Sequence, residues 1–182
     1  MMIVGFTGPA QSGKSTAAKY LVENYGFQEL SFSEHVLQPI LEDRGEPVTK
    51  MNMSKLGDEL REKEGMDALA KHLLEKIDSP RIVISNFRSP EEVQFFIDRT
   101  TNFHLIKMEA EPDTRFKRRN DLNPDEITEF LKRDKKDIAN KGMGLVFDMA
   151  DFKIDNNGPI EHLYERLDEI MEDILPEESD IE

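Results

Sequence analysis

The sequence contains no cysteine. This absence excludes disulfide bonds, thiolate metal sites and a thiol nucleophile. It also has no stretch close to the roughly 20 consecutive apolar residues that a membrane-spanning helix needs, and the short apolar run at its N-terminus is unlike a secretory signal peptide. We therefore expect a cytoplasmic protein.

Basic residues are scarce as well. The chain has 24 lysines and arginines against 38 aspartates and glutamates, which gives a formal net charge of −14 at pH 7. Such a surface repels polyanions, so we expect neither nucleic acid nor a membrane as the main partner. The basic segment 115–119 could still bind nucleotide phosphates locally. The length suits one domain over residues 1–175, followed by an acidic tail at 176–182.

The most informative stretch lies at the N-terminus. Residues 2–6 form a short apolar run that predicts a buried strand. Gly8, Gly13, Lys14 and Ser15 then match the pattern G-x-x-x-x-G-K-[ST] without a gap. The apolar residues that follow have helical spacing, and a strand, a glycine loop and a helix are the context in which this motif binds phosphate.

The chemistry of phosphate binding explains the residue types at the motif positions of this phosphate loop (residues 8–15). Gly8 and Gly13 can adopt backbone angles that a Cβ forbids, so the backbone amides can point at phosphate oxygens at the positive end of the next helix. Lys14 would reach the β- and γ-phosphates, and the Ser15 hydroxyl would bind Mg²⁺. We therefore expect ATP and Mg²⁺. The predicted nucleotide-binding residues of this region are Gly8, Ala10, Gln11, Ser12, Gly13, Lys14, Ser15 and Thr16.

Short apolar runs and segments of helical spacing alternate along the rest of the chain. Further strands are predicted at 28–32, 81–85, 103–108 and 152–154. Between and after them, helices are predicted at 34–43 with Ser33 as N-cap, at 68–77 with Asp67 as N-cap, and at 53–64, 90–99, 112–119, 124–140 and 159–174. This alternation predicts parallel strands joined by right-handed crossovers. The predicted fold is a doubly wound α/β P-loop domain with a five-stranded parallel sheet, a small helical lid and ligands at the carboxyl ends of the strands.

A family resemblance rests on several motifs in order. Residues 150–158 are similar to the Ala-Asp-x-x-Ile-x-Asn-x-Gly run of dephospho-CoA kinases. Residues 86–90 correspond to an Asp-Gly-x-Arg segment, and residues 115–119 to a run of lid arginines. With the phosphate loop, these motifs make nearly the whole chain resemble the nucleoside monophosphate kinase and dephospho-CoA kinase group, most of all its archaeal adenylate-kinase-related branch.

The resemblance implies an ATP-dependent phosphotransferase acting on a nucleoside monophosphate or dephospho-CoA, with acceptor-binding helices at about 33–77 and a lid at about 115–140. Phosphoryl transfer chiefly needs charge neutralised on the moving group, and arginine grips phosphate with two donors. The implied catalytic residues are Lys14, Arg88, Arg115 and Arg119. An ion pair of Arg88 with Glu91 or Glu92 is the alternative for that residue. Asn157 is implied to lie near the adenine.

Two positions depart from the family pattern. Gln38 stands where an arginine would grip the acceptor phosphate, and Arg61 is a candidate replacement. Ser85 stands where an aspartate often supports Mg²⁺. Glu34, Glu109 and Asp155 are other candidate acids, and Glu34 could also serve as a base for a hydroxyl acceptor.

These departures leave a second hypothesis open, an ATP-binding regulatory protein of the same fold with little or no kinase activity. A GTPase is disfavoured because the guanine-reading Asn-Lys-x-Asp pattern is absent. The identity of the small-molecule acceptor and the choice between monomer and homodimer stay open.

Overall fold

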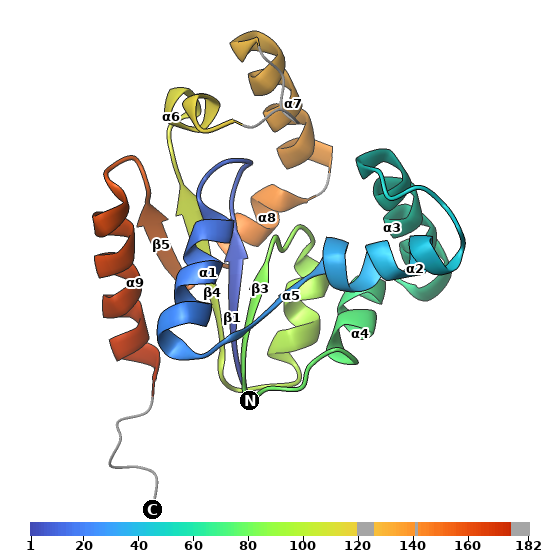
Figure 1. The fold of residues 1–182 in the computed structure, drawn as a ribbon, viewed down its shortest axis with the longest axis horizontal. Coiled ribbons are helices and arrows are strands. Elements are labelled where there is room, and N and C mark those ends of the chain that lie inside the picture. Colours follow the sequence, from blue (N-terminus) through green and yellow to red (C-terminus); the bar gives the residue numbers. More distant parts are fainter. Residues whose placement is uncertain (120–125, 141, 176–182) are drawn as a thin grey trace, which may run out of the picture.

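The computed structural model describes residues 1–119, 126–140 and 142–175. The predicted acidic tail and part of the predicted lid therefore lie outside the described residues. A five-stranded, entirely parallel sheet forms the centre, in the order β2-β3-β1-β4-β5 (Figure 1). Its strands are β1 (Met2–Thr7), β2 (Gln28–Ser31), β3 (Arg81–Ser85), β4 (Phe103–Glu109) and β5 (Phe152–Asp155). The predicted fold class is thus confirmed.

Helices cover both faces of the sheet. Alternate residues of β1 show this directly, because Ile3 belongs to one apolar cluster while Val4 and Phe6 belong to the other. One face packs against α1 (Lys14–Tyr25) and α9 (Ile160–Ile174). The apolar cluster on the other face includes side chains of α2 (Gln38–Asp43), α3 (Lys50–Glu64), α4 (Ala68–Leu74), α5 (Pro90–Ile97) and α8 (Met143–Asp148). In Figure 1, α6 (Pro112–Lys117) and α7 (Ile127–Asn140) stand beyond the carboxyl ends of the strands.

The second helical segment differs from the prediction. Instead of one helix capped by Ser33, the chain forms a π-helical turn, η1 (Ser33–Leu37), followed by α2. Pro39 has no amide to donate back to residue 35, and the wider turn closes instead through the Gln38 amide, which donates to the Ser33 carbonyl. The capping oxygen is Ser31 Oγ, which accepts from the Glu34 amide at 3.1 Å.

Two other helices also depart from expectation. Helix α3 begins at Lys50, three residues before the predicted start, because Thr49 accepts the Asn52 amide as N-cap. The predicted glycine break after α7 contains the start of α8, with Gly142 as its left-handed N-cap at φ 68°. Both differences bring residues to the site described below.

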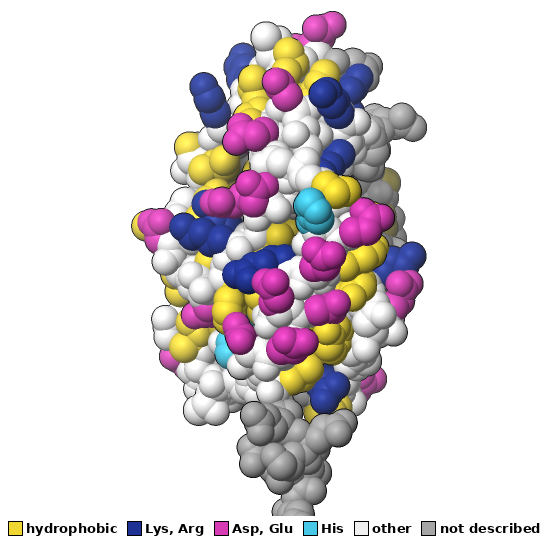
Figure 2. All heavy atoms as spheres, turned by 90° about the vertical axis from the view of Figure 1, so that its left-hand side faces the viewer, with side chains coloured by type: hydrophobic (Ala, Val, Ile, Leu, Met, Phe, Trp, Pro, Cys, Tyr) yellow, Lys and Arg dark blue, Asp and Glu magenta, His cyan; other side chains and the backbone are white. Residues whose placement is uncertain are grey.

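The outer face of α1 and α9 is acidic and tied together by tyrosines. Tyr20 and Tyr25 both donate to Asp168 of α9, at 2.9 and 2.6 Å. Figure 2 shows carboxylates spread over this face and several basic side chains toward the lid end. In the part of the chain that the structure describes, no helix is both long enough and apolar enough to cross a membrane.

Candidate functional site

The phosphate loop between β1 and α1 has backbone amides available for an anion. Gly13 lies at φ +104° and Gly8 at φ +139°, conformations that L side chains rarely adopt. A Cβ on Gly8 would collide with the Met108 carbonyl oxygen, and one on Gly13 with the Asn156 side chain. Among the described residues, no acceptor is recorded for the amides of residues 13–16, which open α1. This is the cradle that a phosphate group fits.

Lys14 is the buried cation of this loop, with 8% of its surface exposed. Its ammonium donates to the carbonyl oxygens of Gly8 and Pro9, at 2.8 Å each. Burial lowers the pKa of Lys14 to about 7; Arg88 and Arg115 lower it further, whereas Asp134 acts in the opposite direction. A bound polyphosphate would reverse this shift by favouring the charged form.

A cleft of about 290 Å³ lies over the loop. All the predicted residues of the loop region except Ser12, which is fully buried, line it. Apart from Pro9, the other lining residues come from α3, the loop after β3, α7 and α8, and they include Lys50, Asn86, Arg88, Asp134 and Met143. The site thus lies where the carboxyl ends of β1 and β3 meet the lid, as expected for a parallel sheet.

Arg88 reaches this cleft because the residue before it is anchored in the core. Phe87 is fully buried, its amide donates to the Phe6 carbonyl at 3.1 Å, and its carbonyl accepts from Thr7 Oγ1 at 3.0 Å. The Phe87 ring occupies the space that a Cβ on Gly5 would fill. Arg88 itself is exposed.

The predicted alternative for Arg88, an ion pair with Glu91 or Glu92, is wrong, since among the described residues the Arg88 side chain pairs with neither. Glu92 is 1% exposed and binds Arg61 at 2.9 Å through Oε1. Its other oxygen accepts from the backbone amides of Arg88 and Ser89, which completes the N-cap of α5. Arg61, the candidate replacement for an arginine at position 38, therefore braces α5 and does not line the cleft.

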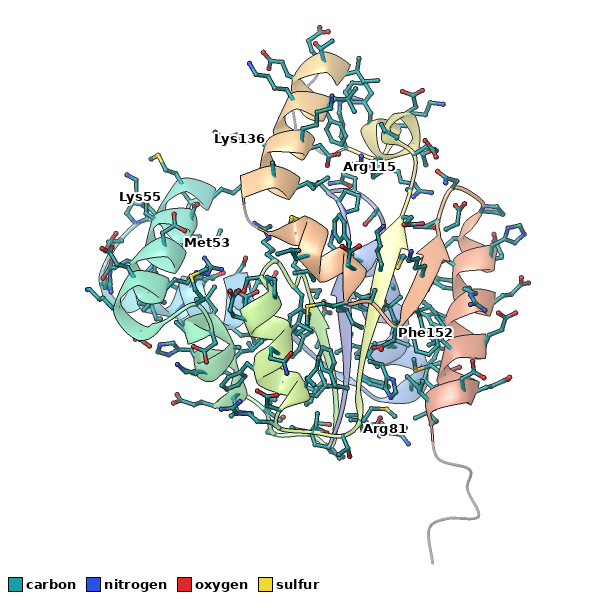
Figure 3. The ribbon with its side chains drawn as sticks, turned by 180° about the vertical axis from the view of Figure 1, so that it is seen from behind. Met53, Lys55, Arg81, Arg115, Lys136 and Phe152 are labelled. Atoms are coloured by element: carbon teal, nitrogen blue, oxygen red, sulfur yellow. The ribbon has the colours of Figure 1, made fainter. Side chains whose placement is uncertain are left out.

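Arg115 lies beside the phosphate loop but is held there by another partner. Its guanidinium donates to the Ala10 carbonyl at 3.1 Å and to both carboxylate oxygens of Asp134, at 2.9 and 2.7 Å. Arg115 is 3% exposed. Figure 3 shows it where α6 meets α7, at the opposite end of the sheet from Arg81. Asp134 was missed as a site residue, because one carboxylate on a polar helix carries no local signal.

The structure does not bring Arg119 and Asn157 into the cleft. Arg119 stacks its guanidinium on the Phe116 ring, 4.1 Å from the centroid. Asn157 is exposed and accepts from the Glu111 amide at 2.7 Å. Its neighbour Asn156 is the residue that contacts the phosphate loop, donating to the Ser12 carbonyl at 2.9 Å. The signal for it was present, since the asparagine of the 150–158 motif is Asn156.

The residues present suit a magnesium ion that arrives with a nucleotide. Ser15 is exposed at the N-terminus of α1, while Ser85 is buried at the end of β3. The candidate acids Glu34, Glu109 and Asp155 do not line the cleft. Among the described residues, no group of three or more acidic, histidine or cysteine side chains could hold a metal ion alone. Ser15 would therefore share the ion with phosphate oxygens and water.

Comparisons with known proteins agree with this site. Residues 7–138 match the family described as AAA domain. The UPF0200 protein of Methanothrix thermoacetophila is 31% identical over 181 residues, covering 96% of this chain and 98% of the relative. That of Thermococcus kodakarensis is 33% identical over 186 residues, covering 96% and 98%. Shikimate kinase from Aquifex aeolicus has the same fold, with a TM-score of 0.58 and 18% identity over 94% of this chain and 96% of the enzyme.

Proposed function

This chain belongs to the AAA domain family and to the archaeal UPF0200 proteins, and from that premise we propose that it is an ATP-dependent phosphotransferase. It moves the γ-phosphate of ATP to a nucleotide or nucleotide-like small molecule, either a nucleoside monophosphate or dephospho-CoA. The observation that carries the proposal is the composition of one cleft, which contains the loop amides, the Lys14 ammonium and the Arg88 guanidinium.

The phosphate loop binds the donor. The amides of residues 13–16 receive phosphate oxygens at the N-terminus of α1. The Lys14 ammonium exchanges the Gly8 and Pro9 carbonyls, its partners at 2.8 Å, for oxygens of the β- and γ-phosphates. The Ser15 hydroxyl would hold Mg²⁺ together with the nucleotide, and the ion would supply positive charge to the transferring group.

Cations on the opposite side of the cleft bind the acceptor. Gln38 donates to Glu42 at 2.8 Å and does not line the cleft, so it is not the group that grips an acceptor phosphate. Lys50 from the first turn of α3 and Arg88 after β3 line the cleft instead. The planar fork of Arg88 suits a phosphate on the acceptor, and its charge suits the transferring group equally well.

A specific observation favours a second candidate, an ATP-binding regulatory protein that turns over slowly. Asp134 binds both terminal nitrogens of Arg115, the lid arginine beside the loop. Moreover, β3 ends in Ser85 and supplies no carboxylate for the metal. A protein with these features could bind ATP tightly and transfer its phosphate rarely.

A transfer assay separates the two candidates. The purified chain is incubated with ATP labelled at the γ-phosphate, Mg²⁺, and either a panel of nucleoside monophosphates or dephospho-CoA. We expect label on one acceptor class and none with Lys14→Met. ATP binding without transfer to any acceptor would favour the regulatory protein, and no binding of ATP would rule out both. GTP in place of ATP serves as the nucleotide control.

A further inference from the structure

We infer that Asn156 is a positioning residue of the phosphate loop, which fixes the peptide group between Ser12 and Gly13 so that the Gly13 amide points toward the bound phosphate. The inference rests on the proposed function, because it requires that the loop bind a polyphosphate. The role predicted for the 150–158 motif is contact with the adenine, and that role does not require Asn156 to bind the phosphate loop.

Asn156 connects the loop to the sheet. It follows β5 directly, and its backbone amide donates to the Glu109 carbonyl at the end of β4, at 2.7 Å. Its side-chain Nδ2 donates to the Ser12 carbonyl at 2.9 Å, across 144 residues of sequence. Asn156 is 7% exposed and Ser12 is fully buried, so water has little access to this hydrogen bond. The orientation of the Ser12 carbonyl is therefore set by the edge of the sheet.

The direction of the Gly13 amide follows from peptide geometry. None of the described peptide bonds is cis, and in a trans peptide the C=O and the following N–H point in opposite directions. Because the Ser12 carbonyl points at Asn156, the Gly13 N–H points away from it. Gly13 lines the cleft, and no acceptor for its amide is recorded among the described residues.

This peptide needs an anchor because glycine leaves it free to turn. Gly13 has no Cβ and adopts positive φ readily, so rotation of the preceding peptide meets little steric resistance. A rotated peptide would place the Ser12 carbonyl oxygen in the phosphate site, where its partial negative charge repels the ligand. The packing is mutual, since a Cβ on Gly13 would collide with Asn156 Nδ2. Gly13 permits the close approach, and Asn156 selects one orientation.

The chain offers a matched control in the next residue. Asn157 has the same side chain but is exposed and binds the Glu111 amide and Asp155. The test compares the full-length wild type with Asn156→Leu, which removes the donor at similar volume, Asn156→Asp, which keeps the shape and removes the donor, and Asn157→Ala. Calorimetry measures the affinity for pyrophosphate and for ATP with Mg²⁺.

We expect both Asn156 variants to lose about tenfold or more in pyrophosphate affinity, because the charge-assisted hydrogen bond from the Gly13 amide to the phosphate is lost. Asn157→Ala should stay within about twofold of wild type. The NMR chemical shift of the Gly13 backbone amide provides a second measurement, because a general packing defect would not affect this one amide selectively. It should shift on pyrophosphate titration in the wild type and in Asn157→Ala, and stay unshifted in the folded Asn156 variants at saturation.

A measurement on the wild type keeps the inference testable if a variant does not fold. The Asn156 side-chain amide protons should exchange slowly with solvent, and fast exchange would overturn the inference. It is also overturned if the wild type binds pyrophosphate and both Asn156 variants bind it equally well, an outcome that leaves the proposed function intact. A variant that binds weakly but shows a normal Gly13 shift equally counts against positioning. If the wild type binds neither pyrophosphate nor ATP, the inference and the proposed function fail together.

Discussion

The phosphate loop and the lid reach the same cleft but are held there by different contacts. The loop continues from β1, whose six residues are all buried, and glycines and Asn156 pack it against the backbone of β4. The described part of the lid depends on side chains: the Arg115–Asp134 ion pair and the Phe116–Phe130 ring contact at 5.7 Å join α6 to α7. Arg115 in turn donates to the Ala10 carbonyl of the phosphate loop at 3.1 Å. A ligand at the loop replaces two neutral carbonyl partners of Lys14, whereas it must compete with the charged carboxylate of Asp134 for Arg115. The comparison indicates a preformed phosphate loop beside two helices, α6 and α7, whose arginine is already paired with a carboxylate.

The largest loss of ATP affinity should follow from a substitution in the phosphate loop. Lys14→Met removes the ammonium that we propose binds the phosphates, and we expect about 10²–10³-fold weaker binding of ATP with Mg²⁺, since two charge-assisted hydrogen bonds are lost. Calorimetry measures the affinity. Lys19→Met is the control, because Lys19 lies on the same helix with 72% of its side chain exposed. Unchanged affinity in Lys14→Met would show that the loop is not the donor site.

The next largest effect is expected at Arg88, which we propose binds the acceptor. Arg88→Ala should lower the rate of phosphoryl transfer by about 10–100-fold, the loss of one charge-assisted contact, with little change in ATP affinity. Because Arg88 is exposed, its removal should leave the melting temperature nearly unchanged. Arg81→Ala at the other end of β3 is the control. An equal loss in both variants would contradict a role for Arg88 in the cleft.

A smaller effect concerns the stability of the empty loop. The pKa of Lys14 is about 7 in the folded chain and ordinarily 10.5, so between these values the unfolded chain binds more protons and stability rises with pH. Below pH 7 both states are protonated and the burial penalty is present in full. Without nucleotide or phosphate buffer, the free energy of unfolding should rise by about 1.4 kcal/mol from pH 6 to pH 8, relative to Lys14→Met. Urea unfolding at several pH values measures it, and parallel curves would contradict a buried, shifted lysine.

The two regions also differ in how far the sequence predicts them. The loop is local, because its glycines, lysine and serine lie within eight positions of one another between a strand and a helix. Sequence therefore predicts the loop, the fold class and the placement of Arg88 after β3. The Arg115–Asp134 pair joins residues that lie 19 positions apart on separate helices, and the Asn156–Ser12 contact spans 144 positions. Neither contact follows from a local sequence pattern. Lys50 was missed for a local reason, since its helix begins one turn earlier than the apolar pattern indicates.

The smallest expected change in ATP affinity is also the most direct test of the difference between the phosphate loop and the lid. Asp134→Asn should bind ATP with Mg²⁺ about threefold more tightly, because the carboxylate that competes with phosphate for Arg115 loses its charge. Loss of that charge also removes the influence that raises the pKa of Lys14, which keeps the gain small. Hydrogen exchange in α7 should become faster without nucleotide, because α7 loses its ion pair with Arg115 of α6. Glu129→Gln, an exposed acid on the same helix, is the control. Weaker ATP binding in Asp134→Asn alone would mean that the carboxylate helps to hold the nucleotide, and the lid would then belong to the preformed site together with the loop.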